Sequence, residues 1–364
     1  MKAHEVVDYL ESQYPTTYQE NYDNTGLLIG NLEARINALL VCLDVTEEII
    51  EEALAKNCQM IISHHPLIFN GLRKLTGRSM VERIVEKAIR YQLCIYAMHT
   101  NLDNLFPGVN GIICEKFGIV ELRVLKPKEN LLRKIVTFCP HDQADAVRKA
   151  MFDAGAGKIG NYDSCSFNTQ GQGTFRPLED ASPFVGAINQ LHVEQEVKIE
   201  AIYPLHLEQN IIGAMTDAHP YEEVAYDILI LGNEDKHAGS GMLGRLLQPT
   251  SASGFLSDVK EKLGLQCLKY AGNGSKIIRK VALCGGSGSF LIQEALKAGA
   301  DIFLTGDLRY HDYFIPDGKM VLADFGHYES EQFTKDLIVQ LLIRKFPTFA
   351  ILKTALNTNP VNFI

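Results

Sequence analysis

The sequence predicts an α/β protein with two related halves and an inserted domain between them. Two βαβ patterns, one toward each end of the chain, are the first observation, and a βαββαβ pattern between them is the second. The third is the composition: 364 residues with 46% hydrophobic and 22% charged residues are typical of a folded chain with more than one domain.

Each βαβ pattern consists of an apolar run of strand length, a segment with helical hydrophobic period, and a second apolar run. The first comprises strand 36–44 (INALLVCLD), helix 45–58 (VTEEIIEEALAKNC) and strand 59–63 (QMIIS), which ends at His64. The second comprises strand 277–286 (IIRKVALCGG), helix 289–300 (SFLIQEALKAGA) and strand 301–307 (DIFLTGD).

The two patterns align without a gap. Cys42 matches Cys284, and Glu52–Leu54 matches Glu294–Leu296, each at a separation of 242 residues. Two unrelated βαβ units could look alike, but a gapless alignment favours duplication. Since α/β folds bind ligands at the carboxyl ends of their strands, two such halves predict a shared crevice.

Each unit is followed by a further apolar strand that ends in a histidine with an acid four residues later. These pairs are His99 with Asp103 and His327 with Glu331, at a separation of 228 residues. Four residues make about one helical turn, so both side chains of a pair would project to one face.

Between the halves the element order changes. The strands are predicted at 132–138, 162–175, 196–204 and 226–231, and the helices at 143–156 and 207–219. This order is that of a ferredoxin-like domain. Polar and glycine-rich segments border it (126–130 and 232–244), so we expect a discontinuous domain of 1–125 and 233–364 interrupted by an insert at 126–232.

Charge and composition exclude several classes of protein. Lys+Arg 35 against Asp+Glu 44 gives a net charge of −9, so nucleic acid is not an expected partner. No apolar run approaches the roughly 18 residues of a membrane span, and acidic residues occupy the start of the chain where a signal peptide is apolar. The eight cysteines form no C-x2-C pair. We expect a cytoplasmic protein with reduced thiols and no membrane contact.

His64 and His65 stand where a buried strand meets a turn at Pro66, so both could face the crevice. They could equally be hydrogen-bonded histidines at a strand end. Together with the two His/acid pairs, they predict a site for two divalent ions, held by imidazoles and bridged by a carboxylate, that activates water. The donor set suits Zn, Fe, Mn, Co or Ni.

Other polar residues are candidates with two interpretations each. Asp307 and His311 occupy the place in the second half that His64 and His65 hold in the first. They could contact the substrate or hold the metal ligands in position. Alternatively, Asp307 caps a helix and His311 is a surface residue. Gly285, Gly286, Ser287 and Gly288 form either a phosphate-binding loop or a tight turn. The segment lacks the third glycine of a dinucleotide-binding motif, because Leu291 stands at that position. Segments 21–30 (NYDNTGLLIG) and 219–223 (HPYEE) either line a site or shape a loop.

Six motifs occur in an order that resembles the NIF-three-like family, whose members are often labelled GTP cyclohydrolase 1 type 2 homologs. They are NYDNTGL (21–27), SHHPLIF (63–69), MHTNLDN (98–104), CGGSG (284–288), LTGDLRYHD (304–312) and DFGHYESE (324–331). Tyr22 stands where the family usually has tryptophan. The middle segment resembles the PII-like or CutA-like insert of the longer bacterial members.

The resemblance implies a toroidal homohexamer with a dinuclear metal centre in each subunit. Its ligands would be His64, His65, Asp103, His327 and Glu331, with His99 as a further ligand or a neighbour of one. The implied activity is metal-dependent hydrolysis of a nucleotide or phosphorylated small molecule, as in GTP cyclohydrolase chemistry. The alternative is a non-catalytic metal-binding regulatory assembly whose insert senses a ligand.

Overall fold

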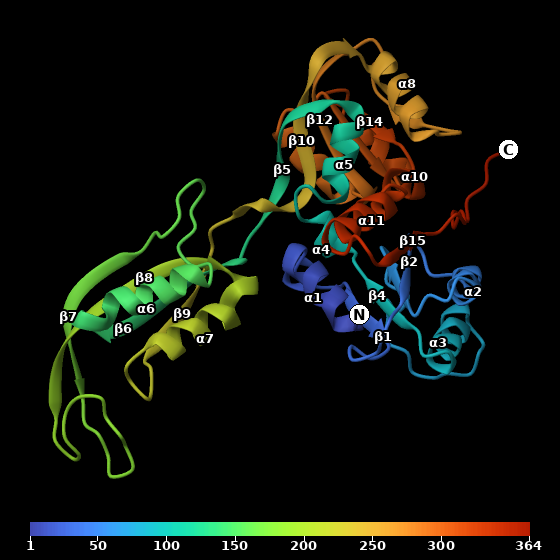
Figure 1. The fold of residues 1–364 in the computed structure, drawn as a ribbon. Coiled ribbons are helices and arrows are strands. Elements are labelled where there is room, and N and C mark those ends of the chain that lie inside the picture. Colours follow the sequence, from blue (N-terminus) through green and yellow to red (C-terminus); the bar gives the residue numbers. More distant parts are fainter. The chain divides into compact units, whose positions relative to one another are not determined.

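The computed structural model describes residues 1–364, which divide into two compact units (Figure 1). Unit 1 combines Met1–Pro127 with Lys236–Ile364, and unit 2 is Lys128–Asp235. The structure is mixed α/β with three sheets, two in unit 1 and one in unit 2. No helix combines the length and apolar character needed to cross a bilayer.

The first sheet of unit 1 is built around three short parallel strands in the order β4-β3-β2, all of them buried. Burial on both faces explains why these strands are uninterrupted apolar runs. The strands are β2 (Ala38–Cys42), β3 (Met60–Ser63), β4 (Cys94–Ala97), β1 (Gly26–Ile29) antiparallel on β4, and β15 (Ala350–Lys353) parallel on β2. The helices α2 (Glu47–Ala55) and α3 (Met80–Arg90) pack on one face, each with an N-cap hydroxyl, from Thr46 and Ser79.

The second sheet repeats this plan in the order β11-β14-β13-β12-β10-β5. Its strands are β12 (Ile277–Ser287), β13 (Ile302–Gly306), β14 (Val321–Asp324), β11 (Lys269–Ala271), β10 (Asp235–Ser251) and β5 (Ile119–Lys128). As β1 does on β4, β11 lies antiparallel on β14. The helix expected at 289–300 is shorter, a 3-10 turn at Ser289–Leu291 followed by α9 (Ile292–Lys297).

Positions 242 residues apart occupy the same face of the two sheets. On the face toward a shared core, Leu39, Val41, Met60 and Ile62 correspond to Val281, Leu283, Ile302 and Leu304. On the opposite face, the strand residues Leu40, Cys42 and Ile61 correspond to Ala282, Cys284 and Phe303. The helical residues that pack on that face correspond as well: Ile49, Ile50 and Ala53 match Leu291, Ile292 and Ala295. The sequence alignment therefore extends to the side-chain direction of each aligned strand residue.

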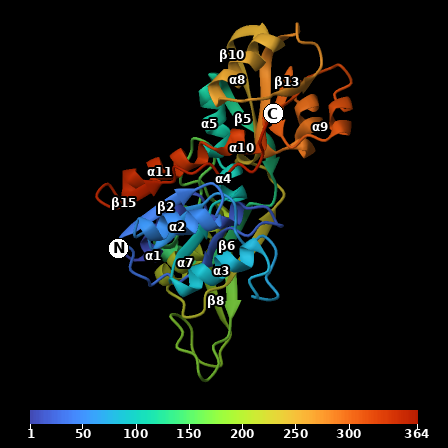
Figure 2. The same ribbon diagram turned by 90° about the vertical axis from the view of Figure 1, so that its right-hand side faces the viewer.

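The shared core also contains residues of four helices: α1 (Ala3–Gln13), α5 (Gly108–Phe117), α8 (Ala252–Leu263) and α11 (Thr334–Lys345). Figure 2 shows α11 between the two sheets. Two one-turn helices, α4 (Thr100–Asp103) and α10 (His327–Glu331), follow the carboxyl ends of β4 and β14. These strand ends carry the polar residues that the sequence singles out.

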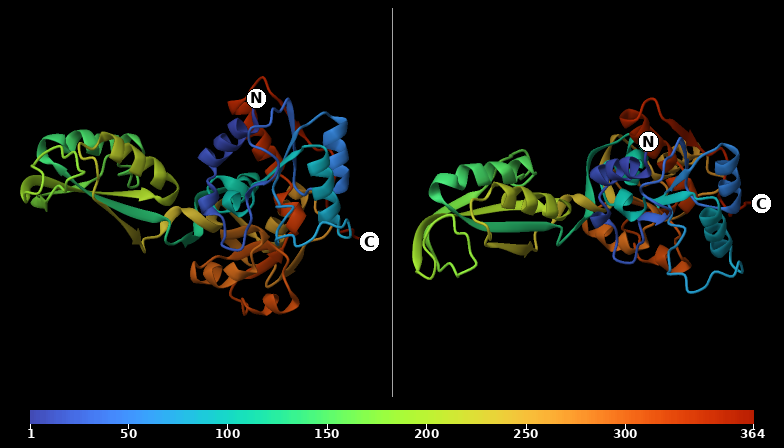
Figure 3. Two further views of the ribbon diagram at one scale, coloured as in Figure 1. Left: turned by 90° about the horizontal axis from the view of Figure 1, so that it is seen from below. Right: turned by 60° about the horizontal axis from the view of Figure 1, so that its bottom comes forward.

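Unit 2 is a four-stranded antiparallel sheet in the order β7-β8-β6-β9. Its elements follow one another as β6 (Leu132–Pro140), α6 (Ala144–Asp153), β7 (Phe167–Phe175), β8 (His192–Pro204), α7 (Glu208–Ala218) and β9 (Tyr226–Leu231). Both helices cover the same face of the sheet (Figure 3), where their apolar residues meet alternate residues of β6 and β8.

Candidate metal centre

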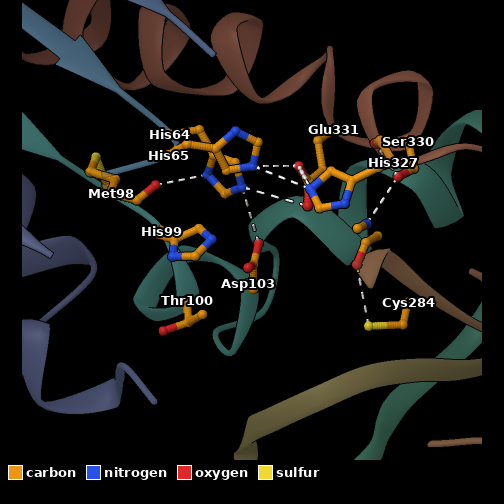
Figure 4. Close-up of polar contacts among 12 residues, drawn as sticks. His64, His65, Met98, His99, Thr100, Asp103, Cys284, His327, Ser330 and Glu331 are labelled. Carbon is orange, nitrogen blue, oxygen red and sulfur yellow. Dashed lines mark hydrogen bonds and ion pairs between the residues drawn. The ribbon is translucent and has the colours of Figure 1, made fainter. Parts of the chain in front are cut away.

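Three strand ends deliver the histidines of the centre. His64 and His65 directly follow β3, His99 precedes α4 after β4, and His327 begins α10 after β14. In both short helices the acid lies one turn after the histidine, so Asp103 and Glu331 project beside the imidazoles. Figure 4 shows these side chains converging from the two halves of unit 1.

The Nε2 atoms of three imidazoles surround the Glu331 carboxylate. Glu331 Oε2 lies 2.9 Å from Nε2 of His65 and 3.1 Å from Nε2 of His327, while its Oε1 lies 3.8 Å from Nε2 of His64. Asp103 Oδ1 is 3.7 Å from the same His64 nitrogen. The close donor groups are His64/His65/His99, His65/His327/Glu331 and His64/Asp103/Glu331. Glu331 belongs to two groups, so one carboxylate could bridge two ions.

Every outer imidazole nitrogen contacts an oxygen of the protein. The Nδ1 partners are Met98 O for His64 at 2.8 Å, Asp44 for His65 at 2.6 Å, Asp23 for His99 at 2.7 Å and Asp307 for His327 at 2.6 Å. An Nδ1–H that donates outward fixes the tautomer in which Nε2 carries a free lone pair. Three of the four acceptors are carboxylates, the arrangement that orients metal-ligating histidines in proteins.

His64 shows most directly that the site suits a cation. Its side chain is fully buried, and its Nε2 has no hydrogen-bond partner. A buried polar nitrogen without a partner is costly, and native proteins rarely leave one. An ion between His64, Asp103 and Glu331 would satisfy it, and this donor set of imidazole and carboxylate suits first-row divalent metals.

The carboxylates of the centre favour positive charge on the imidazoles between them. Burial alone would lower the pKa of His65, but hydrogen bonds with Asp44 and Glu331 raise it to about 10. Burial of His327 is likewise outweighed by Glu331 and Asp307, which raise its pKa to about 9. Glu331 itself, although buried, has its pKa held well below the usual range by the surrounding imidazoles. Divalent ions would displace these protons, because metal ligands bind in deprotonated form.

Three backbone amides of the glycine loop 284–288 are hydrogen-bonded within the protein. The amides of Gly285, Gly286 and Gly288 donate to Asn110 Oδ1, Ser330 Oγ and Thr305 Oγ1 respectively. Glycine is required at 286 because its φ is +62° and a Cβ there would lie 2.2 Å from Glu331 Oε1. From the sequence, we expect a phosphate-binding loop at Gly285, Gly286, Ser287 and Gly288. Three of its backbone N–H groups already donate hydrogen bonds to side chains of the protein.

The structure separates Asp307 from His311. Asp307 accepts a hydrogen bond from His327, so it orients one of the imidazoles. His311 is exposed on a 3-10 turn, where its ring contacts Tyr310 and Phe314, and it belongs to none of the close donor groups.

The segment 219–223 of unit 2 is held by local contacts. His219 Nδ1 accepts from the Tyr221 amide, and its Nε2 donates to the Phe138 carbonyl at 2.9 Å. The Glu222 carboxylate accepts from the Ser182 amide. These contacts shape a loop, and Tyr221, Glu222 and Glu223 of the same segment also line a cavity of unit 2.

Sequence reasoning missed Asp44 and named Asp23 only within the segment 21–30, as part of a site or of a loop. Asp44 follows β2, and it would have been found by applying to that strand the strand-end criterion that singled out His64. Asp23 lies in the part of that segment that precedes β1, and its approach to His99 depends on tertiary contacts.

The matched family model is Duf34/NIF3 (NGG1p interacting factor 3), which covers residues 1–360. A GTP cyclohydrolase 1 type 2 homolog of Halalkalibacterium halodurans is 37% identical over 367 residues, 99% of this chain and 98% of its own. A protein of the same name from Bacillus subtilis is 35% identical, with 100% of this chain and 99% of its own covered. The chain belongs to the Duf34/NIF3 family.

Solved structures show the same architecture over the whole chain. A Bacillus cereus protein related to NIF3 has a TM-score of 0.85 at 37% identity, covering 100% of this chain and 99% of its own. A Staphylococcus aureus protein has a TM-score of 0.78 at 27% identity, with the same coverage.

Proposed function

We propose that the protein is a metal-dependent hydrolase of a nucleotide or another phosphorylated small molecule, with two divalent ions in each subunit. The ligands are His64, His65, Asp103, His327 and Glu331, and His99 is a further candidate. The observation that carries the proposal is the buried Nε2 of His64, which has no hydrogen bond and lies 3.7 and 3.8 Å from carboxylate oxygens of Asp103 and Glu331.

A pair of divalent ions supplies a Lewis acid and a water nucleophile near neutral pH. The protein's own residues orient the imidazoles through Asp44, Asp307 and Asp23, and place Glu331 between the two donor groups. The relatives named GTP cyclohydrolase 1 type 2 homolog support nucleotide hydrolysis as the class of reaction. The metal is one of Zn, Fe, Mn, Co or Ni, which this donor set suits.

The test is a hydrolysis screen of metal-loaded protein on nucleoside mono-, di- and triphosphates, beside His64→Ala and Asp336→Asn. Asp336 pairs with Lys353 on the surface, so its variant is the matched control. We expect turnover of at least one nucleotide that His64→Ala abolishes and Asp336→Asn retains. Metal-loaded protein that hydrolyses none of them would contradict the hydrolase.

The second candidate is a non-catalytic regulatory assembly in which unit 2 senses a ligand. It is favoured by a cavity of about 750 Å³ within unit 2, lined by the aromatic rings of Phe138, Phe175, Phe184 and Tyr221 among others. We propose that residues 126–232, most of which belong to unit 2, are a ferredoxin-like insert of PII or CutA type; the βαββαβ element order supports this. Filling the cavity by Gly171→Leu, where a side chain meets open space, would abolish a response of the metal centre to such a ligand.

We also propose that residues 1–125 and 233–364 form one domain of two duplicated halves and that the protein assembles as a homohexamer. The strand-by-strand correspondence at 242 residues supports duplication. Exposed apolar residues on the edge strand β9, including Ile230 and Leu229, support self-association. Sedimentation at micromolar concentration tests the hexamer, and a monomer would contradict it.

A further inference from the structure

A cavity of about 610 Å³ lies against the metal centre. His65 and His327 line it together with Asp44 and Asp307, the carboxylates that hold their outer nitrogens. Its volume is in the range of small-molecule sites. Part of its wall comes from the C-terminal segment 354–364, through Asn359, Pro360, Val361 and Phe363.

Hydrogen bonds fix this segment beside the centre. The Thr354 amide donates to the Val41 carbonyl at 3.0 Å, which anchors the segment where β15 ends. Thr358 Oγ1 donates to Asp44 Oδ2 at 2.7 Å, while the other oxygen of Asp44 holds His65. Asn359 Nδ2 donates to Glu329 Oε1 at 2.9 Å. The segment is thus tied to the carboxylate that orients a candidate metal ligand.

Two polar residues of the cavity wall, Asp324 and Asn359, are satisfied by the protein itself. Asp324 accepts from Lys269 at 3.0 Å and from the Gly326 amide, and Asn359 Oδ1 accepts from the Val361 amide. The surface that the C-terminal segment contributes to the cavity wall is therefore apolar. Val361 and Phe363 are 58% and 46% exposed, so their surface is available to a ligand.

We propose that residues 359–363 form the specificity wall of the substrate cavity. The substrate class is a small molecule with oxygen donors at one end, which reach the ions, and a planar or apolar part that packs on Val361 and Phe363. This inference rests on the proposed metal centre and adds to it the part of the chain that selects the substrate.

The test compares two hydroxamates that share a metal-binding head. Acetohydroxamate carries a methyl group and benzohydroxamate a planar ring, so a change in the ratio of their dissociation constants between protein variants measures the apolar wall. Binding is followed by the visible spectrum of cobalt-loaded full-length protein. The variants are Val361→Ser with Phe363→Ser, and Leu356→Ser as the matched control, which removes an exposed apolar residue of the same segment outside the cavity lining.

We expect the unmodified protein and Leu356→Ser to prefer benzohydroxamate by about tenfold, the magnitude of burying part of a ring. The double variant should lose this preference while keeping its cobalt content and its affinity for acetohydroxamate. A preference that is absent from the unmodified protein, or unchanged in the double variant, would overturn the specificity wall alone. Failure of the unmodified protein to take up cobalt would instead overturn the metal centre, and the wall with it.

Discussion

Asp44 and Asp307 act on the centre without being candidate ligands themselves. Each accepts a hydrogen bond from the Nδ1 of one imidazole, at 2.6 Å in both cases. Carboxylates in this position raise the basicity of the imidazole and fix its orientation. Replacing them changes the metal affinity while leaving all the candidate ligands in place.

We predict that Asp44→Asn and Asp307→Asn each lower the affinity for divalent metal by about 10- to 100-fold. Asparagine tolerates the positive φ of +57° at position 307, so the backbone there is preserved. Competition with a chromogenic chelator measures the affinity, and Asp336→Asn, on the surface, is the control. Equal affinities in all three variants would show that these carboxylates do not support the centre.

A pH dependence is expected from His219 in unit 2. Burial lowers the pKa of His219, and its Nδ1 accepts from the Tyr221 amide, so protonation would set two N–H groups against each other. Because its folded pKa lies below the unfolded value of about 6.5, the unfolded state takes up the proton first as pH falls. His219 therefore destabilises the folded state progressively below about pH 6.5.

Proton NMR of the His219 ring measures this directly, with His219→Gln to assign the signal. We expect a titration midpoint below 6.5, the reference value for histidine. A midpoint at or above that value would contradict the tautomer assigned here, in which Nε2 donates to Phe138.

The candidate ligands could be predicted from sequence because they follow directly on apolar strands. The position of His64 at a strand end, and the four-residue spacing of His327 and Glu331, are local features. The contact of Asp23 with His99 is not local, since 76 residues separate them and the residues before β1 have no periodic pattern that places them.

At the scale of elements, the close approach of β12 to α10 positions Glu331. Gly286 lies near the end of β12 with a φ of +62°, and a Cβ there would collide with Oε1 of Glu331. Gly118, which ends α5, has a similar φ of +68° but open space where its Cβ would be. The two glycines therefore share the conformational requirement and differ in what surrounds them.

We predict that Gly286→Ala removes metal binding, because Glu331 must move to accommodate the methyl group. Gly118→Ala should cost about 1 kcal/mol of stability from its left-handed backbone and leave metal binding unchanged. Metal content and thermal melting of both variants test this. If the two variants bind equal amounts of metal, the contact between Gly286 and Glu331 does not control the site.

The edge strands of the two sheets could not be predicted. The apolar runs locate β2, β3, β12 and β13, but β5 joins the second sheet although it precedes unit 2, and β15 joins the first sheet although it ends the chain. Both are pairings between segments far apart in sequence, and hydrophobic period carries no information about the partner of an edge strand.

At the scale of the whole molecule, unit 2 is connected to unit 1 through two adjacent strands. β5 leads out of unit 1 and β10 leads back, and they are neighbours in the second sheet. Their approach is close, since a Cβ on Gly239 would lie 2.1 Å from the Lys126 carbonyl oxygen. The two connections are thus held together by unit 1 itself.

We predict that replacing residues 129–234 with a short Gly-Ser linker leaves unit 1 folded and its metal content unchanged. The linker has only to join two strands that are already side by side, which costs little loop entropy. Circular dichroism, melting and metal analysis test this. An unfolded product would mean that unit 1 depends on unit 2 for its stability.

The proposal of a dinuclear metal centre is best tested by counting the divalent ions bound to each chain of purified protein. The count is made for the unmodified chain, Asp103→Asn and Glu331→Gln. Glu331 belongs to two donor groups and Asp103 to one. We expect about two ions in the unmodified chain, about one in Asp103→Asn and none in Glu331→Gln, as for a carboxylate that bridges both ions. An unmodified chain that binds no metal, or a Glu331→Gln variant that retains both ions, would contradict the proposal.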